Sequence, residues 1–131
     1  MNLQTRLISP YAFAGLMDNQ RKNYDMDGII QIVSKHTGKT FEQMLDRSRN
    51  EYLVESRGLC YLFIKQILPQ SRLKEIGNYF GGYDHTSILH NIEAVKNKML
   101  LDNRLCRIYN KIEMELNSCK ILDELKSLKI N

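Results

Sequence analysis

Residues 73–90, LKEIGNYFGGYDHTSILH, determine the fold. A short segment with apolar residues at helical spacing comes first, the Gly81-Gly82 pair follows, and Asp84 precedes a longer helical pattern. Adjacent glycines permit a sharp turn with positive backbone angles, and aspartate is a preferred N-cap residue. Two helices joined by such a turn form a helix-turn-helix. The stretch therefore predicts this motif over residues 71–99.

The candidate binding residues lie at the start of the second helix. In a helix-turn-helix these residues meet base edges in the major groove of DNA. Three of the four residues here have hydrogen-bond donors, and the methyl group of Thr86 suits contact with a thymine methyl. Simple capping is a second interpretation, because Ser, Thr and Asp all favour helix ends. The pattern by itself leaves both open for Asp84, His85, Thr86 and Ser87.

The rest of the sequence predicts an all-α fold, a helix-turn-helix bundle of about six helices with extra C-terminal helices. Gly38 and Pro69 are expected to end helices, Thr40 to start one through a capping box, and Ser71 to cap the first helix of the motif. Periodicity directs Ile88, Leu89, Ile92, Val95 and Met99 inward. The predicted helices cover about 25–36, 41–46, 52–68, 72–80, 85–101 and 103–127.

The bulk properties fit a single domain. The chain has 131 residues, 43% hydrophobic and 26% charged, with a formal net charge of +4 that is compatible with nucleic acid but does not require it. The expected divisions are an N-terminal arm (1–24), the helix-turn-helix domain (25–101) and a C-terminal helical extension (102–131). Three scattered cysteines without a CxxC pair predict reduced thiols, and no apolar run is long enough for a membrane span. The expected location is the cytoplasm, associated with the nucleoid.

The run from Leu73 to His90 closely resembles the signature of the C-terminal DNA-binding domain of DnaA, the bacterial chromosomal replication initiator. That family typically shows EIG..FGGRDHTTVLHA. The similarity also covers the upstream helices and the loop around Arg49, so it extends over about residues 27–100. It implies the family's fold and binding of double-stranded DNA.

The resemblance implies roles for single residues. Arg49 matches the basic-loop arginine that enters the minor groove, while Arg57 and Lys65 match cations that approach the DNA backbone or adjacent bases. Asp84, His85 and Thr86 are identical to family residues at the major groove, and Ser87 replaces a threonine. The expected DNA-binding set is Arg49, Arg57, Lys65, Lys74, Asp84, His85, Thr86 and Ser87.

Three departures from the family pattern bear on function. Tyr83 stands where the family has arginine, Glu51 and Glu55 interrupt the basic loop, and residues 68–72 form a connection one residue longer than usual. Each lost phosphate contact weakens non-specific binding and its salt dependence. The alternative function is therefore a protein-interaction adaptor that retains the helix-turn-helix as a scaffold.

Other chemistries are not expected. Gly38-Lys39-Thr40 is similar to the end of a phosphate-binding loop, but Val33 stands where that motif needs glycine, so no nucleotide and no ATPase activity are predicted. His85 and His90 are five residues apart without further ligands, which disfavours a metal site. Neither an enzyme nor a cofactor is predicted. The broken heptad spacing of the C-terminal stretch leaves packing on the domain itself and a homodimer as alternatives.

Overall fold

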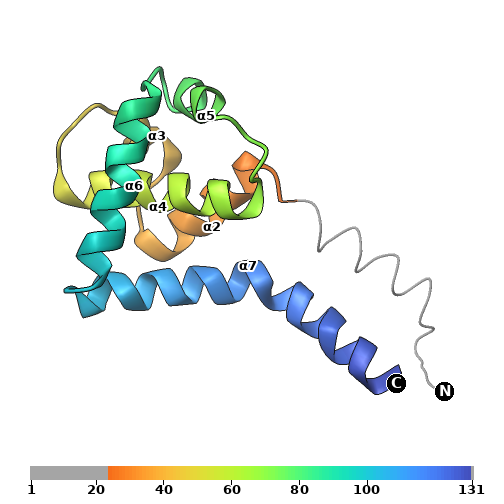
Figure 1. Ribbon diagram of the computed structural model, residues 1–131. Coiled ribbons are helices and arrows are strands. Elements are labelled where there is room, and N and C mark those ends of the chain that lie inside the picture. The colour runs from red at the N-terminus through yellow and green to blue at the C-terminus, as the bar shows by residue number, and fades with distance from the viewer. Residues whose placement is uncertain (1–23, 131) are drawn as a thin grey trace. The chain divides into compact units, whose positions relative to one another are not determined.

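The computed structural model describes the backbone of residues 24–130 and the side chains of residues 24–117 (Figure 1). This part of the chain is all-α, as predicted, and the expected N-terminal arm lies outside it apart from Tyr24. None of its helices is long and apolar enough to cross a membrane. The helices are α2 (Met26–Thr37), α3 (Phe41–Leu45), α4 (Glu51–Ile67), α5 (Leu73–Tyr79), α6 (His85–Met99) and α7 (Asn103–Ile130).

Local capping contacts set the first helices. The Asp25 carboxylate accepts a hydrogen bond from Gly28 N at 2.8 Å, and Gly38, with φ 76°, ends α2 in the left-handed region that glycine favours. Thr40 and Gln43 form the predicted capping box at the start of α3. Gly38 and Thr40 thus serve as a helix stop and a helix start.

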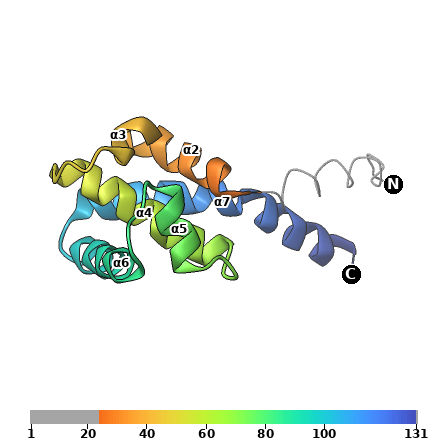
Figure 2. The ribbon, with the colours of Figure 1, turned by 90° about the horizontal axis from the view of Figure 1, so that it is seen from above.

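Helix α4 is central. It packs against α2, α3 and α6, and Figure 2 shows it between α2 and α6. Ten consecutive residues, Glu55–Ile64, are buried, because neighbouring helices cover several of its faces. The largest fully buried side chains are Tyr61, Phe63, Phe80, Ile29, Ile30, Met44, Leu59, Ile64, Ile76, Ile88, Leu105 and Ile112.

Gly58 allows α6 to approach α4 closely. A Cβ atom at this position would lie 2.3 Å from Cγ2 of Val95 and 3.2 Å from the carbonyl oxygen of Asn91. The contact with Val95 is shorter than real Cβ atoms show and the one with Asn91 is tight, so a larger residue requires a shift of α6 or of the Val95 side chain. The glycine therefore helps to fix the position of the second helix of the motif.

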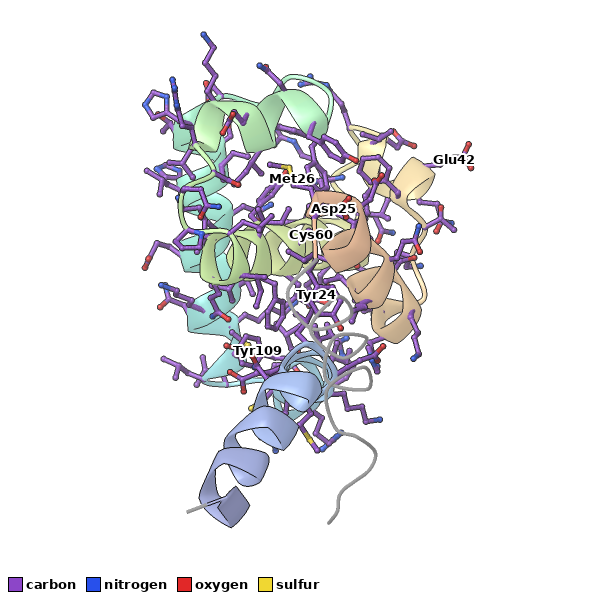
Figure 3. The ribbon with its side chains drawn as sticks, turned by 90° about the vertical axis from the view of Figure 1, so that its right-hand side faces the viewer. Tyr24, Asp25, Met26, Glu42, Cys60 and Tyr109 are labelled. Atoms are coloured by element: carbon purple, nitrogen blue, oxygen red, sulfur yellow. The ribbon has the colours of Figure 1, made fainter. Side chains whose placement is uncertain are left out.

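The compact unit that contains the motif spans Asp25–Glu115, further than the expected boundary at residue 101. The reason lies in the first half of α7, where Leu105 and Ile112 are buried and the Tyr109 ring stacks on Phe63 with centroids 4.8 Å apart. Tyr109 is labelled in Figure 3. Up to residue 115, α7 packs on the core of its own chain.

Two expectations about single residues were wrong. Leu89 is 46% exposed instead of inward, since it lies one position beyond the fully buried Ile88 and therefore on a different face of α6. The N-cap of α5 is Arg72 instead of Ser71. Glu75 Oε1 accepts from the Arg72 backbone N–H at 2.8 Å, so an acidic side chain in the first turn satisfies that donor.

Candidate nucleic-acid interface

The turn between α5 and α6 has the predicted glycine geometry. Gly81 and Gly82 have φ values of 95° and 102°. The backbone N–H groups of Gly82 and Tyr83 both donate to the Gly77 carbonyl, at 2.8 and 3.1 Å. A Cβ atom on Gly77 would lie 1.9 Å from the Tyr83 carbonyl oxygen. Glycine at position 77 is thus as necessary for the tight turn as the pair that forms it.

At the start of α6, capping accounts for only part of the polar cluster. Asp84 Oδ1 accepts from the Ser87 N–H at 2.8 Å. Hydrogen bonds from the backbone and the side chain of Ser87 hold the pKa of the Asp84 carboxyl below its usual range. His85 and Thr86 are exposed, and their side chains make no hydrogen bond within the described part of the chain. The two donors remain available at the N-terminal end of the helix.

The loop before α4 is ordered by short-range hydrogen bonds. Asp46 Oδ1 accepts from Ser48 N at 3.2 Å, Ser48 Oγ accepts from Asn50 N at 3.1 Å, and Asn50 then caps α4. Arg49 lies in this loop and is exposed. It makes neither a hydrogen bond nor an ion pair with its side chain within residues 24–117. The structure thus places an unengaged cation on an ordered loop.

Arg57 supports this loop from inside the protein. It is only 4% exposed, and its guanidinium donates to the carbonyls of Met44, Asp46 and Ser48 at 2.9–3.0 Å. Three carbonyls, one in α3 and two in the segment that follows it, therefore depend on one buried cation. The resemblance implied a DNA contact for Arg57, and the structure shows three of its donors engaged with the end of α3 and the loop carrying Arg49.

Arg47, which the sequence did not single out, joins the loop to the turn. Its Nη2 donates to the Gly81 carbonyl at 2.7 Å, and its guanidinium carbon lies 4.7 Å from the centroid of the Tyr83 ring. The Arg57 guanidinium lies 5.7 Å from the same ring. An aromatic face attracts cations, so tyrosine here accommodates two neighbouring arginines where a third arginine would repel them. The replacement of the family's arginine by Tyr83 therefore removes a positive charge and also adds a contact for two arginines.

The two remaining lysines of the expected set differ. Lys65 Nζ donates to the carbonyls of Pro69 and Ser71, at 3.2 and 2.8 Å, and so stabilises the long connection before α5. Lys74 is exposed on α5 and makes no side-chain hydrogen bond or ion pair among the described residues. The structure therefore leaves Arg49, Lys74, His85 and Thr86 exposed and unengaged.

The acidic residues that interrupt the basic loop in the sequence are neutralised within the protein. Glu55 is buried and accepts from Arg104 Nη2 with both oxygens at 2.9 Å. Glu51 and Glu55 also both pair with Lys98 near the end of α6. These ion pairs join α4 to α6 and to α7. Among the described residues, no group of His, Cys, Asp or Glu side chains is arranged to hold a metal ion.

Comparison with known proteins identifies the arrangement. Residues 26–95 match the family described as the bacterial dnaA protein helix-turn-helix. The chromosomal replication initiator protein DnaA of Chloroflexus aurantiacus is 35% identical over 95 residues, which cover 72% of this chain and 20% of that protein. The DnaA proteins of Campylobacter curvus and Brucella abortus are 29% and 30% identical, over 74% and 79% of this chain.

The matched region corresponds to about a fifth of the length of these relatives, 20% in Chloroflexus aurantiacus and 23% in Campylobacter curvus. The family match runs from the start of α2 to residue 95 within α6, so it includes the loop with Arg49, the glycine turn and the exposed start of α6. On these grounds the chain belongs to the family of the DNA-binding helix-turn-helix of bacterial DnaA.

Proposed function

We propose that this chain binds double-stranded DNA sequence-specifically, with the start of α6 in the major groove and Arg49 in the adjacent minor groove. The observation that carries the proposal is the hydrogen bond of Arg47 to Gly81 together with its stacking on Tyr83. These contacts connect the loop that holds Arg49 to the turn that sets α6. Arg49 and the start of α6, which are proposed to contact bases, are therefore held in place by the same contacts.

We further propose that the target lies in a replication origin or a regulatory region. Support comes from the relatives, which are chromosomal replication initiator proteins. We propose that the chain binds its site without hydrolysing ATP. In support, Gly38 and Thr40, the fragment with a likeness to a phosphate-binding loop, are engaged as helix caps.

Selection from a random duplex library, followed by affinity measurements against salt, tests the proposal. We expect an enriched motif and a clear decrease of log affinity with log salt, because phosphate contacts release counterions. Arg49→Ala and His85→Ala should each lose about 1–3 kcal/mol on the selected site if they contact bases. Arg107→Ala, which removes an exposed arginine from α7, is the matched control and should change affinity much less. Failure to enrich any sequence, with no salt dependence, would refute the proposal.

The recovered motif also reports the oligomeric state. Two half-sites at fixed spacing would support a homodimer through the C-terminal helix, and a single site would support a monomer. The same measurement separates the alternative function, because a protein-interaction adaptor would show equal DNA affinity for Arg49→Ala and wild type. The acidic residues in the basic loop, Glu51 and Glu55, favoured an adaptor, but their pairing with Lys98 gives them a structural role.

A further inference from the structure

The position of Arg49 depends on the backbone beside it, because its side chain makes no hydrogen bond or ion pair in the described part of the chain. The next residue, Asn50, caps α4: its Oδ1 accepts from the Tyr52 N–H at 2.9 Å and from the Leu53 N–H at 3.4 Å. Arg49 is therefore one residue away from a side chain bonded to the N-terminal end of α4 (residues 51–55). Contacts that fix this end of the helix also restrict Arg49.

Arg104, the second residue of α7, contacts the N-terminal end of α4 at two places. Its Nη2 donates to both carboxylate oxygens of Glu55 at 2.9 Å. Its guanidinium carbon lies 5.2 Å from the centroid of the Tyr52 ring. Tyr52 and Glu55 are three residues apart and so lie on one side of α4. A single side chain from α7 thus holds that side of the helix start.

The first turn of α7 in turn orients Arg104. Asp102 Oδ1 accepts from the Leu105 N–H at 3.2 Å, and its Oδ2 lies 3.4 Å from Arg104 Nη2. The hydrogen bond from Leu105 lowers the pKa of the Asp102 carboxyl, which therefore stays charged beside the guanidinium. Leu105 itself is buried in the core. This anchoring comes from beyond residues 26–95, which the family match covers.

The local charges show why the N-terminal end of α4 depends on Arg104. Lys98 pairs with both Glu51 and Glu55, so without Arg104 one cation faces two carboxylates. Glu55 is only 5% exposed, and a buried carboxylate that loses a partner strongly destabilises its surroundings. Movement of this end of α4 towards water relieves that penalty, and such a movement displaces the loop attached to it.

We propose that Arg104 is a positioning residue for Arg49: it fixes the N-terminal end of α4 and, through the Asn50 cap, holds Arg49 in the orientation for the minor groove. The inference rests on the proposed function and makes the start of α7 part of the DNA-binding unit. Arg104 acts through Arg49 and does not itself contact DNA.

A double-mutant cycle tests this dependence. Arg104→Met keeps an unbranched stem and removes the charge and the donors, and it should weaken binding to the selected duplex about fivefold, within the range of coupling between linked residues. In an Arg49→Ala background the same substitution should change affinity little, because the group that Arg104 positions is gone. Arg107→Met makes the same change at an exposed α7 arginine without a hydrogen bond or ion pair in the described region, and it should keep full affinity.

A second measurement reports minor-groove recognition alone. Replacing adenine by 2,6-diaminopurine at one position at a time adds an amino group in the minor groove and leaves the major-groove pattern of the base pair unchanged. At the position beside Arg49 the wild type should lose about tenfold in affinity, the size of one base contact. Arg49→Ala should lose little there, and Arg104→Met clearly less than the wild type. A variant that is less stable but has Arg49 correctly placed would keep the full effect.

Arg104→Lys is the conservative variant. It keeps a charge for Glu55, but a compact ammonium replaces the planar group over Tyr52, so we expect binding about twofold weaker with most of the minor-groove effect retained. If circular dichroism shows that Arg104→Met is unfolded at the assay temperature, Arg104→Lys takes its place in the cycle.

The outcomes separate this inference from the proposed function. A wild type that binds no DNA refutes the proposed function. If the wild type binds and the Arg104 substitutions leave affinity unchanged, the positioning role is wrong. Equal losses with and without Arg49 also overturn it, because Arg104 would then act on DNA independently of Arg49.

Discussion

The guanidinium of Arg47 stacks on the ring of Tyr83 at 4.7 Å, and the same side chain donates a hydrogen bond to the carbonyl of Gly81. These contacts bridge 34 residues of sequence and join the loop before α4 to the turn before α6. The proposed minor-groove and major-groove contacts therefore share one support. A tyrosine at position 83 is part of this support, because its face accepts the arginine that a second arginine would repel.

The contact between Arg47 and Tyr83 should be measurable as a coupling energy. In a double-mutant cycle of Arg47→Ala and Tyr83→Leu, we expect urea unfolding to give about 0.5–1 kcal/mol of coupling, the range of a partly exposed cation–π contact. Tyr83→Phe keeps the aromatic face and should retain most of the coupling. Additive effects in the cycle would show that the stacking does not stabilise the protein.

Arg57 and Arg49, both expected to contact DNA, should differ in their effect on folding. Arg57→Met removes the donor of the carbonyls of Met44, Asp46 and Ser48 and should lower the free energy of unfolding by about 3 kcal/mol. Arg49→Ala, at an exposed side chain without bonds in the described region, should change it by less than about 0.5 kcal/mol. Urea denaturation checks both. Equal effects of the two substitutions would contradict the supporting role of Arg57.

Elements governed by contacts within a few residues could be predicted from the sequence. The cap of α6 at Asp84, the capping box of Thr40 and Gln43, and the glycine turn all depend on atoms no more than six residues apart. The resemblance of residues 73–90 to the family signature further predicted that these elements form a DNA-binding helix-turn-helix. The all-α fold and the helix-turn-helix followed from such local signals.

Features that join distant residues could not be predicted in this way. Periodicity indicated the helical face of Leu89 only to within about one residue, and it did not reveal the burial of Arg57. The pairing of Glu55 with Arg104 spans 49 residues, so a sequence pattern showed only acidic residues within a basic loop. Which side of α4 each charge occupies depends on tertiary packing, and this decides which cations remain for DNA.

The close contact of α5 with the turn predicts a strong effect at Gly77. Gly77→Ala places a methyl group 1.9 Å from a backbone oxygen of Tyr83, so the turn must shift, and we expect about 3 kcal/mol of destabilisation. Gly38→Ala is the control, since Gly38 has nothing within 4 Å of its would-be Cβ and φ 76°. It should lose only about 1–2 kcal/mol from the left-handed backbone conformation. Thermal denaturation of the two variants compares them directly, and a milder effect at Gly77 would contradict the geometry.

The cap of α6 predicts a pH dependence. Because the Ser87 N–H lowers the pKa of Asp84 from 3.8 in the folded state, the stability that the charged cap contributes is fully present above pH 3.8 and is lost as the pH falls through the lower folded value. Asp84→Asn keeps a capping oxygen that does not titrate. The melting temperature of the wild type relative to this variant should therefore be constant from pH 7 to about 4 and decrease below it. A constant difference down to pH 2 would show that the carboxylate is not the cap.

The buried carboxylate of Glu55 separates two explanations of the acidic residues near the basic loop. If Glu55 opposed DNA, Glu55→Gln would strengthen binding, because a negative charge near phosphates would be removed.

In the structure Glu55 instead pairs with Arg104 and Lys98, so the substitution leaves two cations without their buried partner and should lower the free energy of unfolding by about 3 kcal/mol. DNA affinity, measured well below the melting temperature, should not rise. Glu42→Gln on the exposed face of α3 removes the same charge without this pairing and should leave stability within about 0.5 kcal/mol of the wild type. Tighter DNA binding by a fully stable Glu55→Gln protein would show that Glu55 acts on the interface, and that its pairing with Arg104 does not support the fold.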